Sequence, residues 1–355
     1  ARRPPPEPSA LGLSIRSVDM GRREKVFLYF AALIAVLVTF AVYALDQETI
    51  WIGIAKVPEG PASDVLQVLT CLLYIPALAL GMGLLGMVLY PPVMDPDAVP
   101  IQLQLQQGRL AGDNPFRLVF RIVTRGNSPK LVHANVRYAY DVLESCLPRD
   151  RWLLEVANDI PLKLDSLGLP VHELLVPESY KPPGGCLFKA RALQYAVAAS
   201  SASRDDWIVH LDEETRFDAD TVAHILEHCS REQAAVQHRG QKYGHIGQGV
   251  IVYNVHSQEN LLCTLADTIR VSDDFGKFAV QYRLAEQPLI GMHGSFVVCS
   301  NAVEQDVGFD WGVPGSITED TFFAMKCSAA GVHVKWCGGY MYEQSPFGVR
   351  DFAKQ

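Results

Sequence analysis

Three consecutive carboxylates, Asp212, Glu213 and Glu214, directly follow the apolar run 207–211. Acids crowded at the end of a buried strand repel one another, so the arrangement favours a bound cation. Asp212 and Glu214 could hold a hard divalent ion such as Mn²⁺ or Mg²⁺, which takes one or two carboxylates and completes its shell with substrate phosphates. The alternative is a helix N-terminus, where acidic side chains meet the helix dipole favourably.

A second pair of carboxylates, Glu319 and Asp320, follows Thr318 and opens a run, 321–330, that we expect to be helical. Here too a plain structural reading exists, because Thr318 could be an N-cap with the acids in the first turn. A cation that neutralises a leaving diphosphate, together with one carboxylate that takes a proton from an attacking hydroxyl, would suffice for inverting transfer of a sugar. Hydrolysis would instead need two carboxylates.

Three basic residues, Lys181, Lys189 and Arg191, lie close to the pair Gly184-Gly185. They could meet phosphate groups at the start of the helix expected after the glycines. The chain has no GxxxxGK[ST] loop and no GxSxG elbow, so neither a P-loop nucleotidase nor an α/β-hydrolase is indicated.

The elements that must position these residues alternate between strands and helices from Phe116 onward, a pattern typical of an α/β domain with a mostly parallel sheet. The sequence predicts strands over 116–124, 152–156, 171–176 and 207–211, and helices over 130–147, 188–199 and 321–330. In open α/β sheets, ligands bind outside the carboxyl ends of the strands. Asp159 and the acids 212–214 both fall at such ends, and Arg125-Gly126-Asn127 provides turn chemistry after the first strand.

Two uncharged runs precede this domain, 26–45 and 65–90, and each is long enough to cross a bilayer core of about 30 Å as a helix. The first run is longer than the apolar part of a signal peptide and has no cleavage site after it, although a buried core helix remains an alternative for the second. Residues 1–25 form a basic, proline-containing arm, whereas the connector 46–64 carries one lysine and four acidic residues. The positive-inside rule therefore predicts a cytosolic N-terminus and, after a linker over 91–115, a cytosolic domain over 116–355.

Composition agrees with a folded protein, since 49% of the 355 residues are hydrophobic and 20% are charged. The formal net charge of −8 argues against nucleic acid as the main partner. The eight cysteines have no paired CxxC spacing, so we expect them to be mostly free and buried. Of the ten histidines, only His210 and His293 are expected near the site, and a structural role is favoured for each.

Several stretches occur in an order that resembles the egghead family of membrane-bound family 2 glycosyltransferases. They are Thr124-Arg-Gly, Phe188-Lys-Ala-Arg-Ala-Leu-Gln-Tyr, Val209-His-Leu-Asp-Glu-Glu-Thr, Thr268-Ile-Arg-Val-Ser-Asp-Asp, Glu319-Asp-Thr-Phe-Phe-Ala-Met and Met341-Tyr-Glu-Gln-Ser-Pro-Phe. The resemblance implies a GT-A type, Rossmann-like domain behind N-terminal transmembrane helices. It also implies an integral membrane protein of the endoplasmic reticulum or Golgi.

The resemblance also implies roles for individual residues. Asp320 stands at the position of the catalytic base, and Asp212 with either Glu213 or Glu214 stands at the position of the metal-binding Asp-x-Asp. The residues expected to bind the nucleotide-sugar are Thr124, Arg125, Gly126, Asp159, Lys189, Arg191 and Asp212. The residues expected to border the acceptor are Gly294, Ser295 and Glu319.

One family motif, Gln-x-x-Arg-Trp, would begin at Gln355, where the sequence stops. The resemblance therefore predicts that the natural protein continues into Arg-Trp and further membrane helices. The run 275–290 mixes apolar and basic residues, as an interfacial helix or an amphipathic core helix would.

The expected activity is inverting transfer of a hexose to a lipid acceptor at the cytosolic membrane face. By resemblance, the donor is GDP-mannose, the acceptor is glucosylceramide and the new linkage is β-1,4. Two alternatives remain at this point: a processive polysaccharide synthase that uses a UDP-sugar, and an inactive membrane scaffold or lipid-binding protein.

Overall fold

The computed structural model describes residues 83, 86, 89, 116–253 and 260–345. The predicted arm, connector and linker lie outside these residues, as does the predicted span 26–45. The predicted span 65–90 is described only at Gly83, Gly86 and Leu89, which are helical. Searching the described residues finds no helix that combines the length and the apolar character required to cross a membrane.

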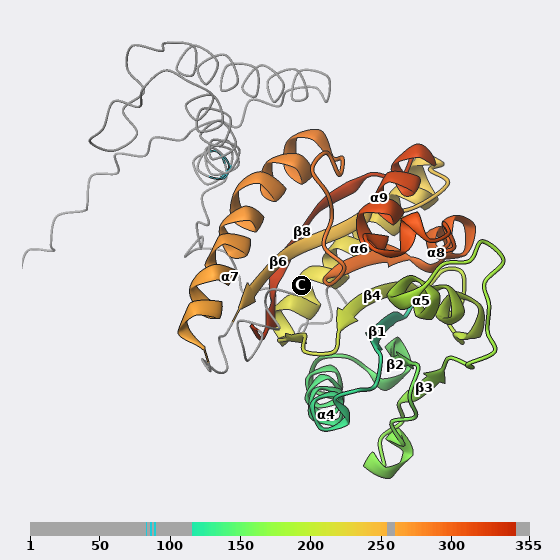
Figure 1. Ribbon diagram of the computed structural model, residues 1–355. Helices are drawn as coiled ribbons and strands as arrows, with labels where there is room; N and C mark the ends of the chain where they lie inside the picture. Colours follow the sequence, from blue (N-terminus) through green and yellow to red (C-terminus); the bar gives the residue numbers. More distant parts are fainter. Residues whose placement is uncertain (1–82, 84–85, 87–88, 90–115, 254–259, 346–355) are drawn as a thin grey trace, which may run out of the picture.

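A single eight-stranded sheet forms the centre of the domain, with the strand order β3-β2-β1-β4-β7-β6-β8-β5 (Figure 1). The strands are β1 (Leu118–Thr124), β2 (Trp152–Asn158), β3 (His172–Leu175), β4 (Trp207–Asp212), β5 (Arg216–Phe217), β6 (Ile246–Tyr253), β7 (Val297–Ser300) and β8 (Val334–Glu343). The predicted α/β class is therefore confirmed.

Strand direction decides which residues reach the same edge of the sheet. Strands β1 to β4 are mutually parallel, β7 runs antiparallel to both β4 and β6, and β8 is parallel to β6. The register places Thr124 opposite Asn158, and Val123 opposite Asp212. The carboxyl ends of β1, β2, β4 and β8 therefore share one edge with the amino end of the reversed strand β7.

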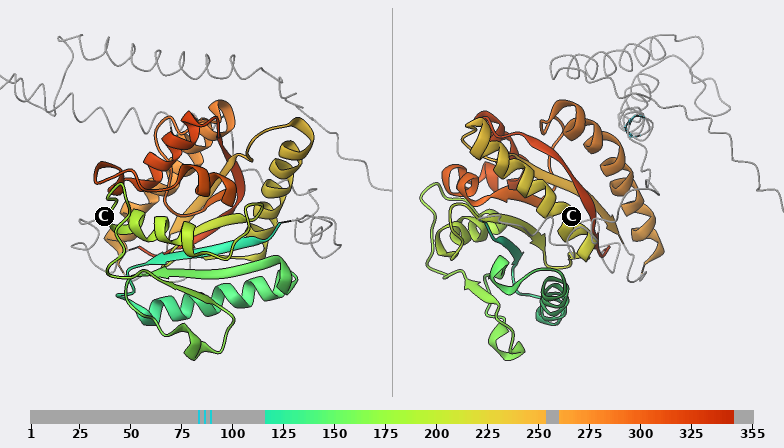
Figure 2. Two further views of the ribbon diagram at one scale, coloured as in Figure 1. Left: turned by 90° about the vertical axis from the view of Figure 1, so that its right-hand side faces the viewer. Right: turned by 180° about the vertical axis from the view of Figure 1, so that it is seen from behind.

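Helices cover both faces of the sheet (Figure 2). Helices α4 (Pro129–Cys146) and α6 (Ala219–Arg239) contact each other on one face, whereas α5 (Phe188–Ala199), α8 (Asn301–Val307) and α9 (Glu319–Ala329) contact one another in sequence on the opposite face. Helix α7 (Leu261–Asp273) packs against β6 and continues into π-helical turns at Asp274–Phe278 and Gln281–Ala285. Short 3₁₀ turns occupy Arg149–Arg151, Leu164–Leu167 and Pro314–Ser316.

The elements predicted from sequence are present, with ends that shift by a few residues. Helix α5 has the predicted bounds, and α4 begins one residue early at Pro129, because proline is well suited to the first helical turn. The run 275–290 fits the core-helix alternative better than an interfacial helix, since Phe278 and Tyr282 are buried in the core. The seven described cysteines are free, and all except Cys146 are buried, as predicted.

Apolar side chains fill both sides of the central strands. Phe120 on β1 stacks on Phe217 on β5, with ring centroids 4.8 Å apart, and Trp207 at the start of β4 is fully buried. Every residue of β1 and β2 is buried. This near-continuous burial explains why these strands read as apolar runs without alternation, as parallel strands between two helical layers do.

Gly126 closes the turn between β1 and α4 with a φ of +84°, in the left-handed region that favours glycine. A Cβ at this position would lie 2.7 Å from the carbonyl oxygen of Ile160. The Gly126 N–H donates to Oγ1 of Thr124 over 2.9 Å, so the turn also fixes that hydroxyl. Gly168 has a φ of +66° but nothing within 4 Å of its Cβ direction.

We expect Gly126→Ala to lower the free energy of unfolding more than Gly168→Ala does. Both changes impose a left-handed conformation that costs about 1–3 kcal/mol, and Gly126→Ala adds a steric clash of about 1–3 kcal/mol. Chemical unfolding followed by tryptophan fluorescence measures both values. Equal destabilisation by the two variants would show that the contact with Ile160 has no energetic effect.

His228 is a fully buried histidine on α6 whose two ring nitrogens are both satisfied in the neutral form. Nε2 donates to the carbonyl oxygen of His245 over 3.0 Å, and Nδ1 accepts from Arg231 over 3.1 Å. Burial lowers the pKa of His228 to about 4. The unfolded chain therefore binds one more proton than the folded protein between that value and the ordinary histidine pKa of about 6.5.

The stability of the protein should consequently fall as the pH drops from about 6.5 to 4, by about 1.4 kcal/mol per pH unit for this histidine. In His228→Gln, urea unfolding at a series of pH values should give a shallower fall. His172→Gln, an exposed change on β3, is the matched control and should leave the slope unaltered. An unchanged slope in His228→Gln would contradict the assignment.

Candidate active site

A cavity of about 480 Å³ opens at the edge of the sheet where the carboxyl ends of β1, β2 and β4 meet. Six residues predicted from sequence to bind substrate or metal line it, namely Thr124, Arg125, Asp159, Lys189, Asp212 and Glu214, and so does Glu319. Their roles stay predictions, but the structure brings residues from separate segments of the chain to one place. The cavity also includes Phe188, Ser316 and Ile317, which the sequence reasoning did not single out.

The acidic triplet lies in a tight turn after β4 and not at a helix N-terminus. Helix α6 begins only at Ala219, and Asp218 is its N-cap, accepting from the Thr221 N–H over 2.8 Å. The helix-dipole alternative for residues 212–214 is therefore wrong. Their position at the open end of a central strand favours the cation-binding interpretation.

Glu213 and Glu214 point to different partners. Thr124 donates its hydroxyl proton to the Glu213 carboxylate, and the side chain of Asn135 donates to the Glu213 carbonyl oxygen over 2.7 Å. Burial raises the pKa of Glu214 to about 8, and the negative charges of Asp212 and Glu343 add to this effect. Glu214 thus belongs to a group of mutually repelling carboxylates, whereas Glu213 contacts residues of β1 and α4.

Glu343, at the end of β8, is a site residue that sequence reasoning missed. It is buried and accepts from the Thr215 hydroxyl over 2.9 Å. The same hydroxyl lies 2.9 Å from Oγ of Ser295, so Ser295 sits beneath the acidic turn and is itself buried. Burial and Asp212 raise the pKa of Glu343 above its usual value. The position of Glu343 at the end of a strand was the signal in the sequence that could have identified it. However, β8 pairs with β6, which is distant in sequence, so the local pattern does not show where this strand end lies.

Lys189, in the first turn of α5, joins the two acidic segments. Its Nζ contacts the carboxylate of Asp212 and lies 3.7 Å from Oε1 of Glu319. Burial alone would lower the pKa of Lys189, but Asp212 and Glu319 raise it above its usual value. The lysine therefore stays charged and holds the end of β4 against the start of α9.

Asp320 lies beside Lys189 and Gly294. A Cβ at Gly294 would be 2.9 Å from Nζ of Lys189 and 3.4 Å from Oδ2 of Asp320, so a side chain there would displace the end of the lysine. Both Glu319 and Asp320 lie in the first turn of α9, as the structural alternative required, but the Thr318 side chain makes no capping hydrogen bond with the described residues. The position of Asp320 in the first turn of a helix, where the dipole favours acidic side chains, is therefore compatible with a role in the site.

Arg191 differs from the predicted nucleotide-binding residues that line the cavity, and Gly126 also lies outside the cavity lining. Its guanidinium donates to Asp159 over 2.7 Å, to the carbonyl oxygen of Pro177 over 2.5 Å and to that of Tyr180 over 3.1 Å. In the described part of the chain it is absent from the residues that line the cavity. Arg191 is thus placed to orient Asp159 and the loop after β3.

The carboxylates could hold a divalent cation beside the lysine. Asp212, Glu214 and Glu343 are close enough for their negative charges to interact, because Asp212 and Glu343 add to the burial that raises the pKa of Glu214. Oxygen ligands from two carboxylates are the usual protein contribution to an Mg²⁺ or Mn²⁺ site that also holds substrate phosphates. Asp212 and Glu214 are therefore suitable ligands.

The two histidines expected near the site have different surroundings. His293 precedes Gly294, and its Nε2 lies 2.5 Å from the buried Asp274. Burial alone would lower the pKa of His293, but Asp274 raises it above its usual value. His293 is therefore bound to a buried carboxylate next to Gly294, which fits the structural role favoured from the sequence.

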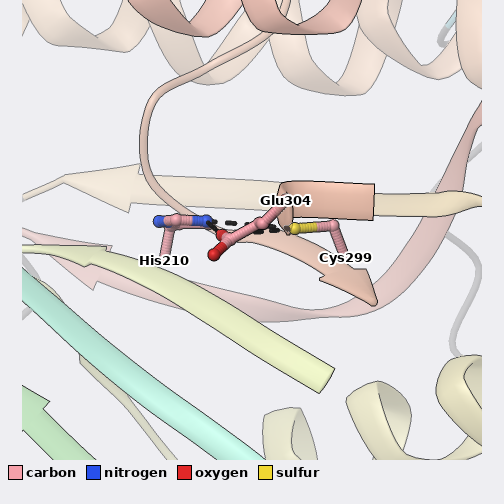
Figure 3. Close-up of side chains that lie close together, drawn as sticks. All are labelled: His210, Cys299 and Glu304. Carbon is pink, nitrogen blue, oxygen red and sulfur yellow. Dashed lines mark hydrogen bonds and ion pairs between the residues drawn. The ribbon is translucent and has the colours of Figure 1, made fainter. Parts of the chain in front are cut away.

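His210 instead belongs to a buried network beneath the sheet. Within the described residues, His210, Cys299 and Glu304 bring possible metal-ligand atoms within 4.8 Å of one another (Figure 3). Glu304 is already paired with the guanidinium of Arg121 over 2.6 Å, and its pKa is lowered to about 2 by Arg121 and His210 in spite of burial. A fixed positive charge in contact with the carboxylate argues against a cation there, so the structural role predicted for His210 fits.

The chain is similar to known glycosyltransferases in sequence. Residues 207–355 match the model of "Glycosyl transferase family group 2". The β-1,4-mannosyltransferase egh of Drosophila melanogaster is 36% identical over 346 residues, which cover 95% of this chain and 70% of the relative. The β-1,4-mannosyltransferase bre-3 of Caenorhabditis elegans is 35% identical, over 92% of this chain and 69% of the relative.

The chain belongs to this family. It is a family 2 glycosyltransferase homologous to egh and bre-3, which confirms both the resemblance and the prediction of a hexosyltransferase.

Solved structures show a more distant likeness. Mannosyl-3-phosphoglycerate synthase from Rubrobacter xylanophilus matches with a TM-score of 0.39 and 12% identity, over 72% of this chain and 74% of that protein. Glucosyl-3-phosphoglycerate synthase from Mycobacterium tuberculosis, in complex with Mn²⁺ and UDP, matches with a TM-score of 0.40 and 12% identity, over 74% and 81%. Nothing about the site of this family 2 enzyme follows from similarities of this size.

The different surroundings of Glu213 and Glu214 give a matched pair of variants. We expect Glu214→Gln to weaken Mn²⁺ binding in the presence of GDP by more than about 10-fold, because it removes a ligand. Glu213→Gln should have a smaller effect, because its partner is Thr124. Electron paramagnetic resonance of free Mn²⁺ measures both, and a larger loss in Glu213→Gln would reverse the assignment.

Proposed function

We propose that this glycosyltransferase moves mannose from GDP-mannose to glucosylceramide, with inversion and formation of a β-1,4 linkage. The observation that carries the proposal is that Asp212 and Asp320 meet at Lys189, with Glu214 beside Asp212. Its relatives egh and bre-3 are named β-1,4-mannosyltransferases, which supports the sugar and the linkage.

The proposed reaction uses separate residues for the leaving group and the acceptor. Asp212 and Glu214 would hold Mn²⁺ or Mg²⁺, which supplies charge neutralisation for the diphosphate. Lys189 is positively charged at the same place, and Thr124 and Arg125 border the donor side of the cavity.

Asp320 takes the proton from the attacking hydroxyl of the acceptor, while Gly294 leaves room for that hydroxyl because a side chain there would meet Lys189 and Asp320. A single base is sufficient, because inversion requires one displacement at the sugar carbon. The half-buried carboxylate of Glu319 is 3.7 Å from Lys189, where it helps to keep the lysine charged.

The proposed location is the cytosolic face of an endoplasmic reticulum or Golgi membrane. The asymmetry between the basic arm 1–25 and the acidic connector 46–64 supports this orientation. A membrane-anchored catalytic domain suits a lipid acceptor, because anchoring keeps the enzyme at the interface where the reacting hydroxyl stays.

The test compares two carboxylate variants of the full chain in lipid nanodiscs. Asp320→Asn should reduce mannose transfer to glucosylceramide by at least about 100-fold while GDP binding with Mn²⁺ stays close to wild type, because general base catalysis contributes about 10²–10⁴-fold. Asp212→Asn should weaken the Mn²⁺-dependent binding of GDP. Transfer is followed with radiolabelled GDP-mannose and binding by calorimetry.

Normal turnover in Asp320→Asn would refute its role as the base. A panel of UDP-glucose, UDP-N-acetylglucosamine and GDP-mannose tests the donor. Polymer formation from a UDP-sugar would replace the proposed single transfer by processive synthesis. Absence of binding to every nucleotide would refute the enzymatic proposal as a whole.

A further inference from the structure

Phe188, the first residue of α5, has an unusual backbone conformation that the proposed reaction does not explain. Its φ is +53°, in the left-handed region that a bulky aromatic residue rarely adopts. It is 55% exposed, whereas Phe120, Trp152 and Trp207 on the central strands are buried. An exposed ring in a strained conformation is a feature that the surrounding structure must maintain.

The loop before Phe188 is fixed by hydrogen bonds from a distant segment. Asp310 accepts from the backbone N–H groups of Gly184 and Cys186, the latter over 3.0 Å. The Leu187 N–H donates to Oγ of Ser316 over 2.8 Å. These contacts hold three of the residues that lead into Phe188, so the direction of its ring is set by the fold.

The ring lies at the donor side of the cavity. Phe188 lines the cavity together with Arg125 from the end of β1, and the guanidinium carbon of Arg125 is 5.6 Å from the ring centroid. The next residue, Lys189, contacts Asp212. Phe188 therefore directly precedes Lys189, one of the charged groups proposed to meet the diphosphate. Gly294 and Asp320 lie next to that lysine.

The proposed donor offers one flat group whose faces need covering, its nucleobase. Stacking on an aromatic side chain covers such a face, and an arginine beside the ring adds a cationic surface. The sugar and the diphosphate are instead expected beside the carboxylates and Lys189.

We propose that Phe188 is the platform on which the nucleobase of the donor stacks, with Arg125 as its cationic neighbour. This inference rests on the proposed function, because it requires a nucleoside diphosphate donor. Every base has a π-face, so the platform contributes affinity for the nucleotide and does not choose between guanine and uracil.

The test uses the full chain in nanodiscs with Mn²⁺ and two probes, GDP and inorganic pyrophosphate. Phe188→Gly removes the ring and suits the left-handed backbone, so the fold should be retained and its thermal stability should not fall. We expect GDP to bind about 5- to 100-fold more weakly, and pyrophosphate to bind as in wild type. Calorimetry measures both affinities.

Four further measurements separate stacking from apolar bulk. Phe188→Trp should retain GDP affinity, because indole also stacks, whereas Phe188→Leu should lose most of it. Leu261→Ala removes a similarly exposed apolar side chain on α7 and should change nothing. UDP should lose affinity by a factor close to that of GDP in Phe188→Gly.

The outcomes distinguish this proposal from the function on which it rests. Wild-type affinity for GDP in Phe188→Gly would overturn the stacking role and leave the proposed function intact. An equal loss of GDP and pyrophosphate binding would also overturn it, by showing that the ring supports the site structure. Wild-type protein that binds neither GDP nor UDP would overturn both proposals.

Discussion

The site depends on the ion pairs that Lys189 makes with carboxylates from two distant segments. Asp212 ends the fourth strand and Glu319 opens α9, and each would repel the other without the lysine between them. Because these groups are shielded from water, their attraction is stronger than that of an exposed ion pair. The same contacts that stabilise the site therefore set the distance between its donor side and Asp320.

The direction of a single strand explains how the loop with Gly294 and Ser295 reaches the site. Strand β7 is antiparallel to its neighbours, so its amino end reaches the edge where the other strands have their carboxyl ends. The loop with Gly294 and Ser295 therefore arrives beside Asp212. Strand β8, parallel to β6, brings Glu343 to the same edge. An all-parallel sheet would have left the loop before β7 on the far side.

Sequence reasoning located the local parts of the site but not their long-range partners. The end of a strand can be read from a few residues, so apolar runs followed by polar residues are sufficient to place Asp159 and Asp212 at the carboxyl edge. The role of Glu343 depends on pairing between β6 and β8, which local periodicity does not reveal. The same holds for Arg191, whose bonds to the loop after β3 draw it away from the cavity. The strained conformation of Phe188 likewise depends on contacts with a segment that is distant in sequence, and a local pattern does not reveal such contacts.

The hydrogen bonds from Asp310 and Ser316 have a mechanical consequence. They join the loop before α5 to the segment that leads into α9. Phe188, which lines the cavity, and Asp320 are therefore connected through a short stretch of hydrogen-bonded backbone. The loop before α5 and the segment that leads into α9 therefore share one set of hydrogen bonds, so Phe188 and Lys189 are positioned together with Glu319 and Asp320.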